Sequence, residues 1–161
     1  MNIQGRIVGF GFLIGLLFWL SGCGQEAKKS GLVVVNVLDK ELFDDCHIAD
    51  SINIPLDELD QKMDAIAQNA EVVFYCSNYQ CTGSGYAAEK FRAKGFENVS
   101  VYEGGMAEWY QAGLPIKGDH LKAYLSKPSQ KFEEEELSSI PIITMEQLAK
   151  KMNVEQQDRA A

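Results

Sequence analysis

Short runs of apolar, β-branched residues alternate with helical patterns along the middle of the chain, and this alternation constrains the fold most. Three of these runs are typical of strands buried on both faces: residues 32–37, 71–75 and 99–102. Apolar residues spaced three and four apart predict a helix from 56 to 69, and 83–94 predicts a second helix. Strands that alternate with helices favour an α/β fold, a parallel sheet flanked by helices on both faces.

Composition limits the size and the partners of this fold. The chain has 161 residues, 46% of them hydrophobic and 24% charged, which suits one compact domain with appendages. A formal net charge of −8 provides no broad cationic face for phosphates, so nucleic-acid binding is not expected. The expected partners are a small molecule or another protein.

The N-terminal residues resemble the signal of a bacterial lipoprotein. Arg6 precedes an uncharged apolar run over 7–20, too short to span a bilayer, and Leu-Ser-Gly then leads into Cys23. The resemblance implies a signal peptide at 1–22, lipidation of Cys23 and a tether at 23–30. We therefore expect export and a lipid anchor in the envelope membrane, on the periplasmic face if the cell is Gram-negative. The alternative is an ordinary cleaved signal with an incidental cysteine.

The remaining chain divides by composition. Residues 31–118 carry the α/β pattern, and 119–139 are expected to form an acidic linker because 133–136 are four consecutive glutamates. Residues 140–161 begin with a strand-like and then a helical pattern, opened by a capping-box spacing of Thr144 and Gln147.

Cys76 is the main candidate for chemistry, because it follows the strand at 71–75, and sites in parallel sheets lie at the carboxyl ends of strands. A thiolate is favoured by the N–H groups of a curled loop and of a helix N-terminus. We therefore expect Cys76 to present an ionised sulfur to an open hollow ringed by main-chain amides; the alternative is a small buried hydrophobe. The loop residues expected to bind substrate are Ser77, Asn78, Tyr79, Gln80, Thr82, Gly83 and Ser84.

An ordered set of short motifs over about residues 31–118 resembles the rhodanese, or sulfurtransferase, family. The set includes His-Ile and Ser-Ile-Asn-Ile-Pro within 47–55, Val-Phe-Tyr-Cys at 73–76, Glu-Gly-Gly at 103–105 and Gly-Leu-Pro at 113–115. The resemblance implies a rhodanese-like fold in which Cys76 takes sulfane sulfur from thiosulfate or a persulfide and passes it to a thiol or other thiophilic acceptor. No metal and no organic cofactor is implied.

The sequence departs from the family pattern in the loop. Many members have an arginine there, whereas 76–84 contains no cation, which makes the anionic donor thiosulfate less certain. The same absence argues against phosphatase chemistry, which needs an arginine where Thr82 stands.

Cys81 is the most unusual residue of the loop. It is a candidate resolving thiol that would form a disulfide with Cys76, or it merely occupies the end of the loop. Cys46 is expected to be structural. Besides sulfur transfer, two functions stay open: a thiol–disulfide redox protein that cycles Cys76 with Cys81, and a rhodanese-like binding module without turnover.

The C-terminal segment supports one further hypothesis. Ile-Thr-Met-Glu-Gln-Leu at 143–148 resembles the strand and helix with which rhodanese-like domains usually begin. We expect residues 140–152 to fold back onto the domain and fill that N-terminal position. The alternative is a detached tail or the beginning of a second repeat.

Overall fold

The computed structural model describes residues 31–127 and 139–155. The predicted signal peptide, Cys23 and the tether before residue 31 lie outside the described residues, as does most of the predicted acidic linker. Within the part that is described, no helix is both long enough and apolar enough to cross a membrane.

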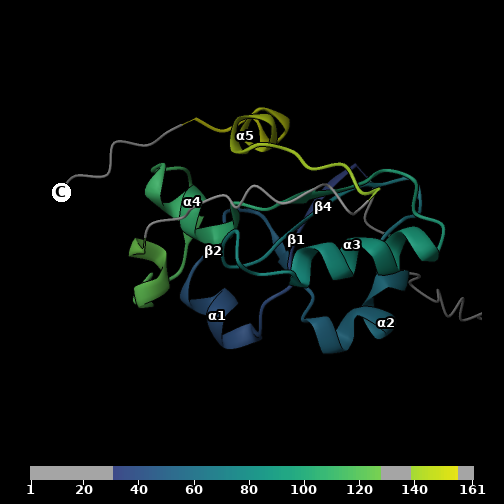
Figure 1. Ribbon diagram of the computed structural model, residues 1–161, viewed down its shortest axis with the longest axis horizontal. Helices are drawn as coiled ribbons and strands as arrows, with labels where there is room; N and C mark the ends of the chain where they lie inside the picture. The colour runs from purple at the N-terminus through teal and green to yellow at the C-terminus, as the bar shows by residue number, and fades with distance from the viewer. Residues whose placement is uncertain (1–30, 128–138, 156–161) are drawn as a thin grey trace, which may run out of the picture.

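A parallel sheet forms the centre of the molecule (Figure 1). Its strand order is β3-β1-β4-β5, and every neighbouring pair is parallel. The strands are β1 (Leu32–Asn36), β3 (Ile52–Asn53), β4 (Glu71–Tyr75) and β5 (Val99–Tyr102). A separate antiparallel pair joins β2 (His47–Ile48) to β6 (Ile116–Lys117).

The helices cover both faces of this sheet. They are α1 (Lys40–Asp45), α2 (Leu59–Lys62), α3 (Gly83–Ala93), α4 (Gly105–Gln111) and α5 (Met145–Met152), with short 3₁₀ turns at η1 (Leu56–Glu58), η2 (Met63–Ala65) and η3 (Ala123–Ser126).

The alternation of side chains along β1 explains the two cores. Val33 and Val35 pack in a cluster with Phe91 of α3, whereas Val34 packs in the opposite cluster with Trp109 of α4. Successive side chains of a strand point to opposite faces, so a run of valines fills both cores at once. The α/β class expected from the sequence is confirmed.

The helix expected from 56 to 69 is broken into three short turns. Leu59, Met63 and Ile66 are buried as the apolar stripe predicted, but Leu56 is 38% exposed. The structure has η1, α2 and η2 in succession here, and Ile66 is already extended. The apolar stripe therefore predicted the burial of Leu59, Met63 and Ile66 correctly. Its prediction of one continuous helix is wrong.

The packed domain extends beyond residue 118, into the start of the region expected to be a linker. Asp45 accepts hydrogen bonds through its carboxylate oxygens from the main-chain N–H groups of Leu121 and Lys122. Leu125 in η3 is only 1% exposed and packs in the cluster of Trp109. The composition of the sequence predicted a linker from residue 119. In the structure, the apolar contacts of the domain continue as far as η3.

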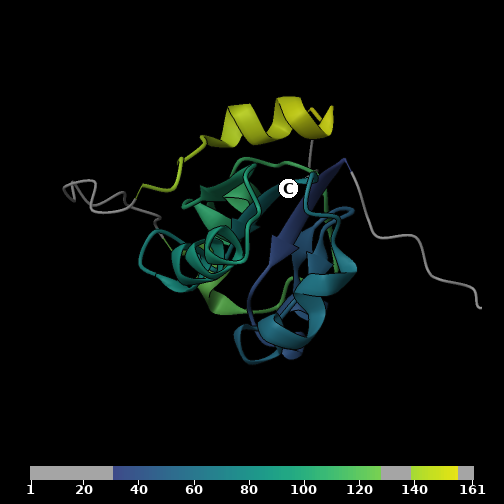
Figure 2. The same cartoon turned by 90° about the vertical axis from the view of Figure 1, so that its right-hand side faces the viewer.

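The C-terminal segment lies along the outer edge of β5 and then crosses to one face of the sheet (Figure 2). Val101 forms a parallel bridge with Ile142: its N–H donates to the Pro141 carbonyl at 2.9 Å, and its carbonyl accepts from the Ile143 N–H at 2.9 Å. Leu148 of α5 is fully buried against the α4 face. The contacts that a folded-back segment requires are therefore present.

The start of α5 has the expected capping box. The Gln147 N–H donates to the Thr144 hydroxyl, and the Thr144 N–H donates to the Gln147 side-chain oxygen. A capping box satisfies two N–H groups that a helix start otherwise leaves without partners.

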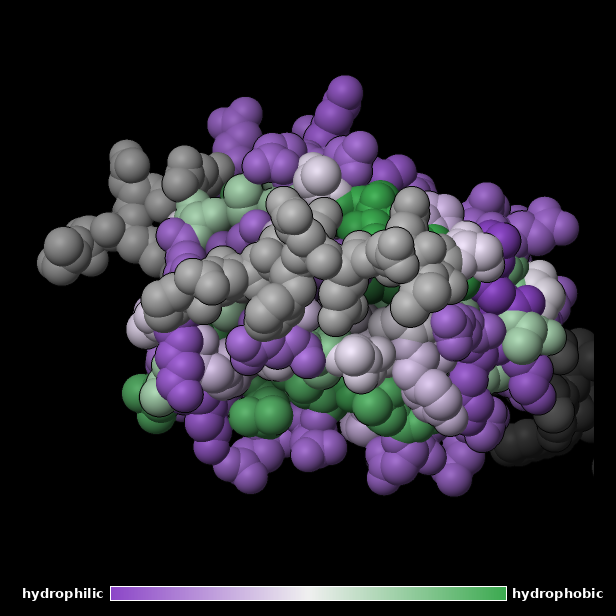
Figure 3. All heavy atoms as spheres, in the orientation of Figure 1, coloured by the Kyte–Doolittle hydropathy of each residue, from purple (hydrophilic) through white to green (hydrophobic). Residues whose placement is uncertain are grey.

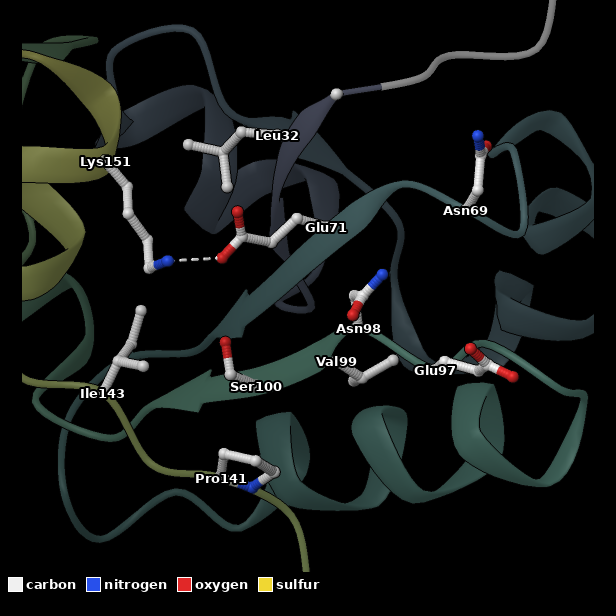
Figure 4. Close-up of a pocket in the computed structure, with 11 residues that line it drawn as sticks. Leu32, Asn69, Glu71, Glu97, Asn98, Val99, Ser100, Pro141, Ile143 and Lys151 are labelled. Atoms are coloured by element: carbon white, nitrogen blue, oxygen red, sulfur yellow. Dashed lines mark hydrogen bonds and ion pairs between the residues drawn. The ribbon is translucent and has the colours of Figure 1, made fainter.

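A cleft of about 680 Å³ lies between this segment and the beginnings of the strands. In Figure 4, Lys151 of α5 reaches across it to Glu71, and the two form an ion pair of 2.6 Å. Leu32 and Val99, at the starts of β1 and β5, line the same cleft. It lies at the end of the sheet opposite to the carboxyl ends of the strands, where Cys76 is found.

On the face shown in Figure 3, hydrophilic side chains dominate the outline and hydrophobic ones form separate patches. The large hydrophobic side chains that are exposed among the described residues are Leu56, Tyr86, Leu121 and Ile142.

Candidate active site

The strand-to-helix connection between β4 and α3 carries both candidate cysteines. β4 ends at Tyr75, Cys76 is the next residue, and α3 begins at Gly83. The Cys81 N–H donates to the Asn78 carbonyl at 3.0 Å, which curls the connection into a turn. The loop therefore lies at the carboxyl end of the sheet, as the sequence predicted.

The start of α4 fixes the first residues of this loop. The N–H groups of Met106 and Ala107 donate to the carbonyls of Cys76 and Ser77, each at 2.9 Å. Gly105 makes this approach possible, since its φ is +61° and a Cβ there would lie 2.6 Å from the Cys76 carbonyl oxygen. A side chain at this position would be strained and would push the loop away.

A partly buried carboxylate fixes the middle of the loop. Glu108 of α4 accepts a hydrogen bond from the Tyr79 hydroxyl and another from the Tyr102 hydroxyl, both at 2.8 Å. Burial, with the nearby charge of Glu108, raises the pKa of both tyrosines, so both hydroxyls keep their protons and act as donors. Tyr79 thus ties the loop to α4 and β5.

Cys76 lies in surroundings that favour its thiol form. Its side chain is fully buried, and its Sγ donates to the Cys81 carbonyl oxygen at 3.0 Å and lies 3.8 Å from that of Asn78. Hydrogen bonding with the Cys81 thiol, followed by burial, raises the pKa of Cys76, while the Ser84 side chain and N–H oppose this in part. The structure does not contain the open hollow expected around Cys76, because this side chain is fully buried and the carbonyls of the turn lie against its sulfur.

Cys81 is the more accessible of the two loop cysteines. It is partly exposed, and the hydrogen bond from Cys76 is the largest of the effects that lower the pKa of Cys81 to about 5. The N–H groups of Gly83 and Ser77 and the Ser77 hydroxyl add to this lowering of the Cys81 pKa, and burial opposes it. Donors of this kind, at the start of an eleven-residue helix, favour a thiolate.

The other loop residues predicted to bind substrate fall into two groups. The Asn78 side-chain oxygen accepts from the Gln80 N–H at 3.0 Å and so supports the turn, while Ser84 is buried beneath Cys76. Gln80 and Thr82 are exposed to solvent.

The third cysteine of the described domain, Cys46, is fully buried in the core cluster of Trp109. Among residues 31–127 and 139–155, no group of three or more His, Cys, Asp or Glu side chains is placed to hold a metal ion.

Sequence reasoning missed two residues of this site. Glu108 carries no local signal, since it meets Tyr79 only after α4 packs beside the loop. Gly105 was noted only as part of a family motif, and the structure supplies its physical reason. The local sequence signal for Gly105 was a pair of glycines, at 104 and 105, directly before a helical pattern.

Comparisons with known proteins agree with this architecture. Residues 24–112, more than half of the chain, match the family described as "Rhodanese-like domain". An uncharacterized protein, slr1261 of Synechocystis, is 32% identical over 91 residues, which is 56% of this chain and half the length of that protein.

Solved structures also resemble the fold, and two of them serve as examples. The BH2092 protein of Bacillus halodurans superposes with a TM-score of 0.53 at 31% identity, over 61% of this chain and 72% of that one. A thiosulfate sulfurtransferase of Pseudomonas aeruginosa has a TM-score of 0.50 at 22% identity, over 55% of this chain and 17% of that one, a likeness of fold alone.

The ordered motifs, the parallel sheet with the cysteine loop after β4, and the match over 24–112 lead to one conclusion: this chain belongs to the rhodanese-like domain family.

Proposed function

We propose that this protein is a sulfurtransferase that carries sulfane sulfur as a persulfide on the loop between β4 and α3. The single observation that supports it best is the pair of cysteines in the loop at the carboxyl end of β4, where the Cys76 Sγ donates to the Cys81 carbonyl oxygen at 3.0 Å. The family resemblance assigns the persulfide to Cys76.

The proposed reaction has two displacements at sulfur. A loop thiolate attacks the outer sulfur of a donor persulfide; the donor S–S bond breaks, a cysteine S–S bond forms, and the donor leaves as a thiolate with the bonding electron pair. An acceptor thiolate then attacks the outer sulfur of the protein persulfide and restores the loop thiolate. No net oxidation occurs, because one persulfide replaces another.

The charge of the loop favours a persulfide over thiosulfate as donor. Residues 76–84 contain no Lys, Arg or His, and the carboxylate of Glu108 lies against the loop through Tyr79. The loop has no cation that could form paired hydrogen bonds with the oxygens of a thiosulfate dianion. A thiol persulfide carries a single negative charge, for which N–H donors suffice.

The test is sulfur transfer from glutathione persulfide and from thiosulfate to cyanide, measured for the wild type, for Cys76→Ser with Cys81→Ser, and for a Leu121→Ala control. The wild type and the control should turn over, faster with the persulfide, and the double variant should be inactive. Intact-protein mass spectrometry should show one added sulfur atom after loading. A wild type that acquires no sulfur from either donor would refute the proposal.

A second candidate is thiol–disulfide exchange, which the same pair of thiols favours. A partly exposed thiolate beside a buried thiol is the arrangement that opens and closes a disulfide in dithiol enzymes. Equilibration in glutathione redox buffers tests it. A Cys76–Cys81 disulfide that forms and is reduced within the range of glutathione potentials would support it.

We also propose that Cys23 carries a lipid anchor outside the cytosol, on the strength of the residues that precede it. Mass spectrometry of the protein purified from membranes would show acyl chains on Cys23, and Cys23→Ser would release the protein into the soluble fraction.

A further inference from the structure

The turn that follows Cys76 closes off its sulfur. Cys76 is fully buried, and the carbonyl oxygens of Asn78 and Cys81 lie 3.8 and 3.0 Å from its Sγ. Both carbonyls belong to the turn. A main-chain carbonyl presents the negative end of its dipole to the sulfur and disfavours a thiolate there. The closed turn therefore blocks a sulfur donor and also keeps the thiol protonated.

A donor to the same sulfur comes from α3 and not from the turn. The Ser84 hydroxyl donates to the Cys76 Sγ at 3.7 Å, and Ser84 is buried in the first turn of this helix. A hydrogen bond of this kind favours the ionised form of a thiol. When the turn moves away, its two carbonyls leave the sulfur and the Ser84 hydroxyl stays. One movement thus opens a path to Cys76 and makes its thiolate easier to form.

The Tyr79 side chain holds the movable part of the turn against the domain. Among the hydrogen bonds that the structure describes for residues 78–81, the others stay within 76–83. The Tyr79 hydroxyl instead donates to Glu108 of α4 at 2.8 Å. A charged acceptor makes this bond stronger than one between neutral groups. Because both side chains are only partly buried, the bond can break without unfolding of the core.

We infer that the hydrogen bond between Tyr79 and Glu108 is a latch on the turn, and that a sulfur donor reaches Cys76 only when this latch opens. The inference rests on the proposed function, and it makes Tyr79 and Glu108 positioning residues. In the open form the Cys76 thiol releases its proton to solvent, and the thiolate attacks the outer sulfur of a donor persulfide. The donor S–S bond breaks, the donor thiolate leaves with the bonding electron pair, and a persulfide forms on Cys76.

The rate at which iodoacetamide alkylates Cys76 measures opening of the turn without any sulfur chemistry. Each protein in this comparison carries Cys81→Ser, so that Cys76 is the single thiol of the loop and the main-chain carbonyl at position 81 is kept. Cleavage after lysine then places Cys76 on residues 63–90 and Cys46 on residues 41–62, and the fragment masses give the two rates separately.

Two phenylalanine variants test the latch. Tyr79→Phe removes the donor on the turn. Tyr102→Phe is the matched control, because the Tyr102 hydroxyl donates to the same Glu108 carboxylate from β5, also at 2.8 Å. Circular dichroism of each variant confirms folding.

We expect alkylation of Cys76 to be at least about tenfold faster in Tyr79→Phe than in the parent protein, which corresponds to about 1.4 kcal/mol. The loss of a hydrogen bond to a charged group destabilises the closed turn and raises the population of the open one. Tyr102→Phe should stay within about threefold of the parent, since it leaves the Tyr79 hydrogen bond in place.

Low concentrations of urea separate opening of the turn from unfolding of the domain. Cys46 is fully buried in the core and reports unfolding. Unfolding exposes much surface, so the Cys46 rate should rise steeply with urea, whereas opening of one turn exposes little and the Cys76 rate should hardly change.

Three results would overturn the inference: an unchanged Cys76 rate in Tyr79→Phe, a Cys76 rate that rises with urea as steeply as the Cys46 rate, or an equal acceleration in Tyr102→Phe.

Sulfur uptake distinguishes a failure of this inference from a failure of the proposed function. In chains that retain Cys81, and with glutathione persulfide as donor, Tyr79→Phe should acquire sulfur about tenfold faster than the wild type. Equal uptake despite faster alkylation would overturn the role of the latch in sulfur transfer. If no protein acquires sulfur, the proposed function fails, and the alkylation rates still decide whether Tyr79 holds the turn closed.

Discussion

Leu148 offers the sharpest test of the folded-back C-terminal segment. Its side chain is fully buried against the core cluster of Trp109, although 42 residues, 103–144, separate α5 from β5 in sequence. Truncation of a buried leucine removes its transfer free energy and leaves a cavity, which together cost about 2–5 kcal/mol. We therefore expect Leu148→Ala to lower the free energy of unfolding by about 3 kcal/mol.

Urea denaturation followed by tryptophan fluorescence measures this loss, since Trp109 packs in the same cluster. With a slope of about 2 kcal/mol per molar urea, the midpoint should fall by roughly 1.5 M without a change in slope. Leu121→Ala is the matched control, because Leu121 is 79% exposed and its truncation should change stability by less than about 0.5 kcal/mol. An equally small effect of Leu148→Ala would mean that α5 does not pack on the domain in solution.

The remaining predictions concern the loop. Gly105→Ala should cost at least about 2 kcal/mol and slow sulfur loading, because it adds left-handed strain and a contact of 2.6 Å with the Cys76 carbonyl oxygen; urea denaturation and persulfide uptake measure both effects. Glu108→Gln should cost about 1–3 kcal/mol in the same denaturation, as the Tyr79 hydroxyl loses a charged acceptor. Between pH 5 and 8, the stability of the wild type should rise relative to Cys81→Ser by on the order of 1–2 kcal/mol, after allowance for solvent screening of a partly exposed sulfur. The sign follows because the unfolded thiol still holds a proton that the folded thiolate has lost, and a flat difference across this range would contradict the lowered pKa of Cys81.

Much of the fold was predictable because its signals are local. The alternation of Val33, Val34 and Val35 between two cores follows from the period of a strand, and the run of valines was visible in the sequence. The capping box at Thr144 is likewise a local pattern, and the structure contains both of its hydrogen bonds.

The parts that escaped prediction depend on distant packing. The helix from residue 56 is broken into short turns, and no proline or glycine within it marks the breaks. The burial of Leu125 depends on its contact with the α4 face, while the acidic residues that follow gave the stronger local signal. Glu108 is an ordinary surface residue of a helical pattern until Tyr79 and Tyr102 close around it.

The two cysteines show the same limit at the level of chemistry. Sequence order places Cys76 at the end of a strand, where reactive groups of α/β proteins are found, and this is correct for its position. The charge of its sulfur depends on which main-chain groups the following turn aims at it. Here the turn aims the Asn78 and Cys81 carbonyls at the Cys76 sulfur, which also accepts a hydrogen bond from the Ser84 hydroxyl.

A loop without a cation has only main-chain dipoles and neutral donors with which to hold an anion. Such donors act over a few ångströms, so the charge of a loop sulfur depends on the groups that the turn brings against it. Cys81, five residues after Cys76, meets the first turn of α3, whereas Cys76 lies below the turn among carbonyls. The two cysteines are therefore parts of one arrangement: the turn that buries Cys76 also brings Cys81 to the start of α3, in a loop that contains no arginine.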